Sequence, residues 1–313
     1  MIADSPDLTV TIAGLQFRNP VIAASGTFGY GREYSGFLDI AALGGICSKG
    51  LTLNPRPGNT GIRLHETPSG LMNSIGLENP GISAFIENEL PLMLELGPVI
   101  IANLSGATED EYVQGARLLD ASEVDMIELN ISCPNLKAGG MSFGLDPGIA
   151  EALTRQVRRA APNKPLMVKL SPNAPDIEAV ARSCVSAGAD ALSLVNTFKA
   201  LAIDIDKRKP VFENISAGLS GPAIRPIALR MVWELCEAVS KMKPAIPIVG
   251  MGGIASASDA LEFLLAGAAA VQVGSATFAH PPLMNEVIDG IRDYMKERDF
   301  AVLGSLSIRK AFR

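Results

Sequence analysis

One cysteine of this chain stands between two asparagines, just after an apolar run that reads as a strand. The segment is Asn130-Ile-Ser-Cys133-Pro-Asn135, and residues 125–129 precede it. A thiol framed by amide side chains at a strand end is typical of a reaction site, because amides can hold a polar substrate beside the sulfur. The same residues could form a plain turn, since proline lacks a backbone donor and asparagine favours turns. Which interpretation holds depends on where the fold places this strand end.

The four cysteines and two histidines show no metal-ligand spacing. Cys47, Cys184 and Cys236 fall within apolar strand or helix patterns, so we expect them in the core. No Cys-x-x-Cys pair is present, and the histidines, His65 and His280, stand far apart in the sequence. Zinc sites and cysteine-ligated iron-sulfur clusters need clustered ligands, so the sequence predicts neither. Electron transfer through a metal would then require another chain.

The composition indicates a cytoplasmic, soluble protein that does not bind nucleic acid. The chain has 313 residues and a formal net charge of -6, and its longest basic cluster covers only residues 207–209. Binding to phosphate backbones relies on clustered Lys and Arg, which argues against a nucleic-acid surface. The sequence contains no stretch of about 18 apolar residues that would predict a membrane span, and residues 1–8 do not resemble a secretion signal. We expect a single domain over residues 1–313.

Apolar runs rich in β-branched residues recur eight times, and segments with helical periodicity lie between most of them. Such runs are typical of buried parallel strands. Eight strands alternating with helices predict a (β/α)8 barrel. The predicted strands are 20–26, 44–50, 98–105, 126–132, 165–171, 191–197, 246–252 and 270–275, and the predicted helices are 109–119, 147–160, 176–187, 224–242, 256–266 and 283–297.

A doubly wound sheet is the competing architecture, but its dinucleotide-binding form needs Gly-x-Gly-x-x-Gly after the first strand. The nearest match, Gly26-Thr-Phe-Gly29-Tyr-Gly31, has the wrong spacing. A typical barrel takes about 250 residues, so we expect extensions. These are an amino-terminal hairpin over residues 8–17 and inserts over 51–97 and 198–221. Both inserts follow strand ends, and they should therefore lie on the catalytic face.

Small and polar residues end all eight predicted strands, and a barrel would bring these ends together at one mouth. Each could be an ordinary loop start, but amides and lysines at so many ends favour a binding site. Glycines after the last two strands are typical of a phosphate site, with tight turns as the alternative. A phosphate beside lysine and amides suits flavin mononucleotide (FMN), whose ring has a polar edge. The strand-end residues are Ser25, Gly26, Lys49, Gly50, Asn103, Asn130, Cys133, Lys169, Asn196, Thr197, Gly252, Gly253, Gly274 and Ser275.

The motifs at these strand ends resemble those of the class 1 dihydroorotate dehydrogenases. The resemblance covers nearly the whole chain and is carried by residues 130–144, 73–77, 48–50 and 195–197, which read NISCPNLKAGGMSFG, NSIGL, SKG and VNT. The segment after the cysteine is most similar to the catalytic subunit of the class 1B enzymes, which pair with a second subunit bearing FAD and a [2Fe-2S] cluster. Class 1A enzymes, fumarate-reducing homodimers, differ after Cys-Pro-Asn, and class 2 enzymes use a serine base and add a membrane segment.

The resemblance implies oxidation of (S)-dihydroorotate to orotate in pyrimidine biosynthesis, with a hydride passing from C6 to FMN N5 and a proton from C5 to Cys133. It implies a heterotetramer, in which a homodimer of this chain binds two copies of the iron-sulfur flavoprotein that passes electrons to NAD. The substrate contacts that it implies are Lys49, Asn73, Ser74, Ile75, Gly76, Leu77, Asn130, Asn135, Asn196 and Thr197. The FMN contacts that it implies are Ser25, Lys49, Gly50, Asn103, Asn130, Lys169, Val195, Gly221, Gly252, Gly253, Gly274 and Ser275.

Three other functions stay open at this point. A class 1A-type enzyme would reduce fumarate without a partner. An aldolase-like barrel would use Lys169 as a Schiff-base nucleophile, and a catalytically silent barrel would serve only as a subunit or binding module. The Gly139-Gly140 pair predicts a hinged loop over residues 136–145 that closes over the substrate, and a plain surface loop fits the sequence equally well.

Overall fold

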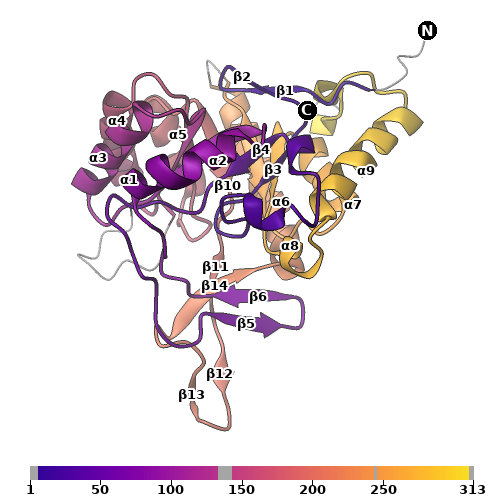
Figure 1. The fold of residues 1–313 in the computed structure, drawn as a ribbon. Helices are drawn as coiled ribbons and strands as arrows, with labels where there is room; N and C mark the ends of the chain where they lie inside the picture. Colours follow the sequence, from indigo (N-terminus) through magenta and orange to yellow (C-terminus); the bar gives the residue numbers. More distant parts are fainter. Residues whose placement is uncertain (1–5, 133–142, 243–244, 310–313) are drawn as a thin grey trace.

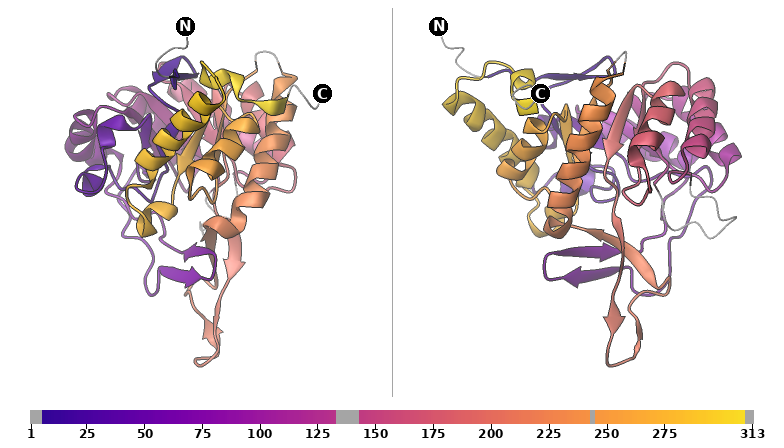
Figure 2. Two further views of the ribbon diagram at one scale, coloured as in Figure 1. Left: turned by 90° about the vertical axis from the view of Figure 1, so that its right-hand side faces the viewer. Right: turned by 180° about the vertical axis from the view of Figure 1, so that it is seen from behind.

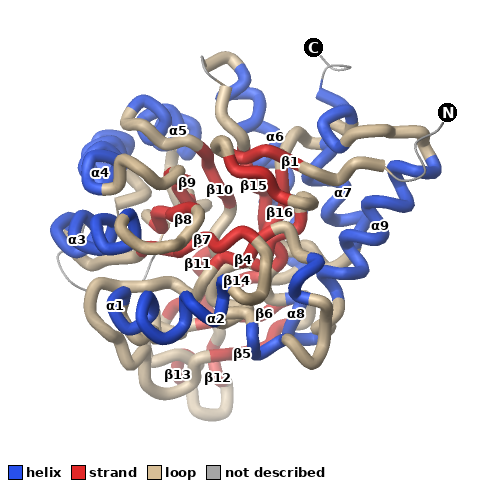
Figure 3. Tube along the Cα trace, turned by 45° about the horizontal axis from the view of Figure 1, so that its top comes forward, coloured by secondary structure: helices blue, strands red, loops and turns tan. Residues whose placement is uncertain are grey.

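The computed structural model describes residues 6–132, 143–242 and 245–309, and at its centre lies a closed barrel of eight parallel strands. Neighbouring barrel strands follow chain order, and the last pairs with the first, so that Val271 lies opposite Val21. Helices surround these strands (Figure 3), which confirms the predicted (β/α)8 fold. The barrel strands are β3 (Val21–Ala23), β4 (Gly45–Cys47), β7 (Val99–Leu104), β8 (Met126–Asn130), β9 (Leu166–Lys169), β10 (Ala191–Leu194), β15 (Ile248–Met251) and β16 (Ala270–Val273).

Four of the outer helices begin at a residue whose side chain caps the first turn. Thr108, Asp146, Asp176 and Ser256 each accept a hydrogen bond from the backbone N–H three residues later. In the described ranges no helix is both long enough and apolar enough to cross a bilayer. The helices are α1 (Ile82–Ala84), α2 (Leu90–Leu94), α3 (Glu109–Asp120), α4 (Pro147–Ala160), α5 (Ile177–Ser186), α6 (Arg225–Ser240), α7 (Ala257–Leu265), α8 (Ala276–Ala279) and α9 (Leu283–Glu297).

Alternation along each strand separates a core inside the barrel from a core between barrel and helices. In β8, Met126 belongs to the interior cluster, whereas Ile127 and Leu129 pack with the helices. Ile12 and Phe17 of the amino-terminal hairpin are fully buried in the interior cluster. The hairpin therefore closes one end of the barrel, as Figure 1 shows. Its strands are β1 (Val10–Ile12) and β2 (Leu15–Phe17).

The two inserts pair with each other in one four-stranded antiparallel sheet, which sequence analysis did not predict. The strand order is β11-β14-β6-β5, and Asn73 of the first insert lies opposite Gly218 of the second. This sheet lies at the end of the barrel away from the hairpin, and the short β12-β13 arm projects beyond it (Figures 1 and 2). The strands of the inserts are β5 (Leu64–Thr67), β6 (Gly70–Asn73), β11 (Phe198–Leu201), β12 (Ile203–Asp204), β13 (Lys209–Pro210) and β14 (Ser216–Ser220).

Candidate active site

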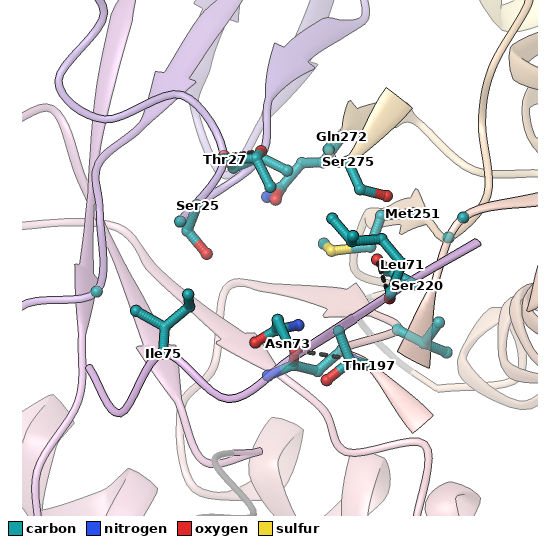
Figure 4. Close-up of a pocket in the computed structure, with 18 of the residues that line it drawn as sticks. Ser25, Thr27, Leu71, Asn73, Ile75, Thr197, Ser220, Met251, Gln272 and Ser275 are labelled. Atoms are coloured by element: carbon teal, nitrogen blue, oxygen red, sulfur yellow. Dashed lines mark hydrogen bonds between the residues drawn. The ribbon is translucent and has the colours of Figure 1, made fainter. Parts of the chain in front are cut away.

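A pocket of about 320 Å³ lies between the carboxyl ends of the barrel strands and the insert sheet. Figure 4 shows Ser25 and Gln272 from the barrel on one side of it, and Asn73 and Ile75 from the first insert on the other. Cavities of this size hold small ligands. Of the residues predicted to bind substrate or cofactor, the pocket is lined by Ser25, Lys49, Gly50, Asn73, Ile75, Gly76, Leu77, Asn103, Asn130, Lys169, Val195, Asn196, Thr197, Gly221, Gly252, Gly253, Gly274 and Ser275.

The structure describes the chain after β8 as far as Ser132, which lies at the wall of this pocket. Ser132 Oγ donates to Asn130 Oδ1 at 2.7 Å and accepts from Asn196 Nδ2 at 2.6 Å. Both asparagines line the pocket, so Ser132 is held at its wall by the end of β8 and by the loop after β10. Outside the described residues lie Cys133, Asn135 and the predicted hinge at Gly139-Gly140.

Ser74 is the one predicted site residue in the described ranges that does not line the pocket. It is buried, and its hydroxyl accepts from Asn59 Nδ2 at 3.0 Å and from Asn214 Nδ2 at 3.3 Å. Those partners come one from each insert. The side chain of Ser74 therefore connects the two inserts, while Asn73 beside it lines the cavity.

A buried carboxylate that sequence analysis missed lies beneath the pocket. Glu128 has no exposed surface, and its Oε1 accepts from Ser193 Oγ and Gln272 Nε2, both at 2.8 Å. Its Oε2 accepts from Asn103 Nδ2 at 2.5 Å and from Cys47 Sγ at 3.2 Å. The available signal was a charged residue within the apolar run of β8, two positions before a predicted site residue and hence on the same strand face.

Lys169 and Glu128 form an ion pair at the floor of the pocket, and Lys169 is the member that faces the cavity. Lys169 Nζ lies 3.9 Å from Glu128 Oε2 and donates to Ser25 Oγ at 3.2 Å. Burial alone would raise the pKa of Glu128, but the Lys169 ammonium and the donated hydrogen bonds outweigh burial and hold that pKa below its usual range. Glu128 is therefore ionised at neutral pH. Lys169 lines the pocket, and Glu128 lies behind it.

Glycines form a cradle at the other side of the pocket. Gly221, Gly252 and Gly253 have φ values of 96°, 128° and 75°, in the region that favours glycine. A Cβ on Gly253 would lie 2.7 Å from the backbone oxygen of Gly221 and 2.8 Å from Cβ of Arg225. All three glycines line the pocket, and glycine backbone of this kind can approach an anion such as a phosphate closely.

Replacing Gly253 by alanine is expected to lower the free energy of unfolding by about 2 kcal/mol, because a left-handed residue acquires a Cβ that meets backbone. It should also weaken retention of a phosphorylated cofactor. Denaturant unfolding and cofactor content after gel filtration measure the two effects. Gly36→Ala is the matched control, since a Cβ at Gly36 meets nothing within 4 Å and its φ is not positive. Equal behaviour of the two variants would contradict the steric role of Gly253.

A closed (β/α)8 barrel with a polar pocket at the carboxyl ends of its strands defines the chain as a barrel enzyme. The model of the dihydroorotate dehydrogenase family matches residues 7–295. The catalytic subunit of dihydroorotate dehydrogenase B (NAD(+)) from Petrotoga mobilis is 57% identical over 95% of this chain and 97% of its own length. The protein with the same description from Geotalea daltonii is 51% identical over 97% of this chain and 99% of its own length. The one from Thermoanaerobacter pseudethanolicus is 49% identical over 96% of this chain and 99% of its own length. The chain therefore belongs to the dihydroorotate dehydrogenase family.

Proposed function

We propose that this chain is the catalytic subunit of an NAD-dependent dihydroorotate dehydrogenase and oxidises (S)-dihydroorotate to orotate in pyrimidine biosynthesis. The observation that carries the proposal is the 57% identity to the catalytic subunit from Petrotoga mobilis, along nearly the whole of both chains. Family membership favours this activity over the aldolase and the silent binding module. The pairing of Lys169 with the buried carboxylate of Glu128 also weighs against the aldolase, because a Schiff-base lysine must be free to attack a carbonyl.

The residues of the pocket fit FMN. Gly252 and Gly253, with Gly274 and Ser275, line the pocket and suit the phosphate, because glycine lets the backbone N–H groups approach an anion closely. Lys169 and the amide of Asn103 line the barrel floor, where they suit the polar edge of the flavin ring. Bound there, FMN supplies the acceptor for the hydride that leaves C6 of the substrate.

Neutral amides hold the substrate in this proposal. Asn73, Asn130 and Asn196 line one continuous pocket, and together they offer donors and acceptors for a ring built of amide groups. Asn135 is proposed as a fourth amide contact. Lys49 supplies the positive charge for the substrate carboxylate, and Thr197 and residues 75–77, which line the pocket, complete the contacts.

Cys133 is the base that takes the proton from C5. Ser132, which precedes it, is held by Asn130 and Asn196, and both of these are proposed to contact the substrate. A base on one face of the ring and a hydride acceptor on the other allow the two bonds to break without a relay through histidine.

A partner subunit completes the electron path. The description of the relatives as catalytic subunits supports a second subunit, and the resemblance to class 1B assigns it FAD and a [2Fe-2S] cluster. Two copies of each chain would form a heterotetramer around a homodimer of this chain. The NAD-dependent relatives favour this acceptor over fumarate.

The test uses the purified chain without oxygen. Adding (S)-dihydroorotate is expected to bleach the absorbance of bound FMN and to produce one orotate per flavin. Reduction of NAD is expected only after the co-expressed iron-sulfur flavoprotein is added. A yellow protein that dihydroorotate does not bleach would contradict the dehydrogenase, and rapid reduction of fumarate by the chain alone would assign it to class 1A.

A further inference from the structure

Glu128 is a charged residue that lies directly beneath the pocket but does not contact the cavity. It has no exposed surface and does not line the pocket. Its carboxylate nevertheless accepts hydrogen bonds from four different barrel strands. Burying a charge is costly unless it is paired and hydrogen-bonded, and a purely structural core could place an apolar residue here. The buried charge of Glu128 is therefore better explained by a function in the pocket above it than by core packing.

The ionised carboxylate fixes the orientation of the amides around it. An ionised carboxylate only accepts, so Asn103 and Gln272 must each turn their nitrogen toward Glu128. Asn103 Oδ1 then points the other way and accepts from Asn130 Nδ2 at 3.2 Å. Gln272 Oε1 is also turned away, and it is buried without a hydrogen-bond partner in the described part of the chain. One charge thus orders three amides that line the pocket.

The same carboxylate also sets the field that Lys169 exerts on the pocket. The ammonium lies 3.9 Å from Glu128 Oε2 and is itself nearly buried, with 4% of the residue exposed. In such a site water screens little of the interaction between the two charges. Because the cation is on the pocket side, the ligand meets a positive charge that the anion behind it partly cancels.

We propose that Glu128 is a positioning residue that orients the pocket amides and, by opposing the charge of Lys169, lowers the reduction potential of the bound flavin. The proposal rests on the proposed function in one respect, that FMN occupies this pocket. Two-electron reduction adds electron density to the flavin ring, and nearby charge tunes that step. Lys169 alone would favour reduction, and Glu128 restrains it.

The test is the midpoint potential of bound FMN in Glu128→Gln, measured by equilibration with a redox dye without dihydroorotate. The variant keeps the shape of the side chain and removes its charge. Ser193 can rotate its hydroxyl to accept from the new amide, and Gln272 can turn its amide over, so the packing can adapt. The expected result is a shift of about tenfold toward the reduced form, which is about 30 mV for a two-electron couple.

Ser193→Ala is the matched control, because it removes one hydrogen bond to Glu128 and leaves the charge in place. Its potential is expected to match that of the wild type. If Glu128→Gln holds FMN with an unshifted potential, or if Ser193→Ala shifts it as much, the charge of Glu128 does not tune the cofactor.

A second comparison keeps the proposal testable should Glu128→Gln fold poorly. In Lys169→Met the potential should fall, and adding Glu128→Gln to that variant should raise it again by a similar factor. Equal potentials in the single and double variants would overturn the proposal. Failure of the proposed function looks different, since it leaves the wild-type chain without FMN or leaves its FMN unbleached by dihydroorotate.

Discussion

The variant Cys133→Ser is expected to keep FMN bound and to reduce it with dihydroorotate about 10² to 10⁴ times more slowly than the wild type. A positioned general base contributes a factor of this size, and the serine hydroxyl is far less acidic than a thiol. Anaerobic rapid mixing with dihydroorotate, followed by flavin absorbance, measures the rate. An unperturbed thiol has a pKa of about 8.5, so the wild-type rate should rise with pH toward that value, whereas the rate of the variant should not follow it.

Cys184→Ala is the control for this experiment, because it removes a thiol that cannot serve as a base. Cys184 is fully buried in the core between barrel and helices. Burial raises its pKa to about 12, so almost no thiolate forms near neutral pH. Reduction by this variant is expected at the wild-type rate. A Cys133→Ser enzyme that reduces its flavin as fast as Cys184→Ala would remove Cys133 from the mechanism.

Local patterns were sufficient to predict the barrel and most of its mouth. Each predicted strand is a short apolar run that ends in a small or polar residue, and parallel strands bring their carboxyl ends to one face. Asn130 and Lys169, predicted from their places at strand ends, both line the pocket. The prediction succeeded because chain position within a strand fixes which end of the barrel a residue reaches.

The insert sheet could not be predicted in this way, because its pairing joins residues far apart in sequence. Leu71 lies opposite Ser220, and no periodicity in either segment specifies that register. Ser74 was assigned to the pocket on the family motif, while its side chain bonds to Asn59 and Asn214. Its neighbour Asn73 lines the cavity, and alternation in extended chain would have placed the two side chains on opposite faces.

Glu128 was missed for a different physical reason. Sequence analysis examined the ends of the strands, and Glu128 lies within β8, where barrels normally pack apolar side chains. Its meaning depends on Lys169, which lies one strand away and 41 positions later in the chain. A charged residue in an apolar strand indicates a partner of opposite charge. Which residue that partner is follows only from strand register, here Asn130 opposite Lys169.

Lys169→Met is expected to lower the free energy of unfolding by about 3 kcal/mol at neutral pH, because it leaves the charge of Glu128 buried without an opposite charge. That value is at the lower end for a broken buried pair, since the four hydrogen bonds of the carboxylate remain. Denaturant unfolding of the FMN-free chain, with wild type and variant compared at the same pH, measures the loss. Adding Glu128→Gln should restore most of it, because neither charge is then left alone.

The sign of the pH dependence separates this electrostatic loss from a packing loss. In the wild type the pKa of Glu128 is lowered, so its contribution to stability is present above the ordinary Glu pKa of about 4.3 and is lost as the pH falls. Without Lys169, burial is expected to raise the pKa of Glu128 above its unfolded value. Protonation of Glu128 then removes the unpaired buried charge and stabilises the variant as the pH falls. The stability difference between wild type and Lys169→Met should therefore shrink on acidification. Two results together would contradict this account: a stability difference between wild type and Lys169→Met that stays constant with pH, and a double variant no more stable than Lys169→Met. They would show that the packing of the lysine, and not its charge, stabilises the floor of the pocket.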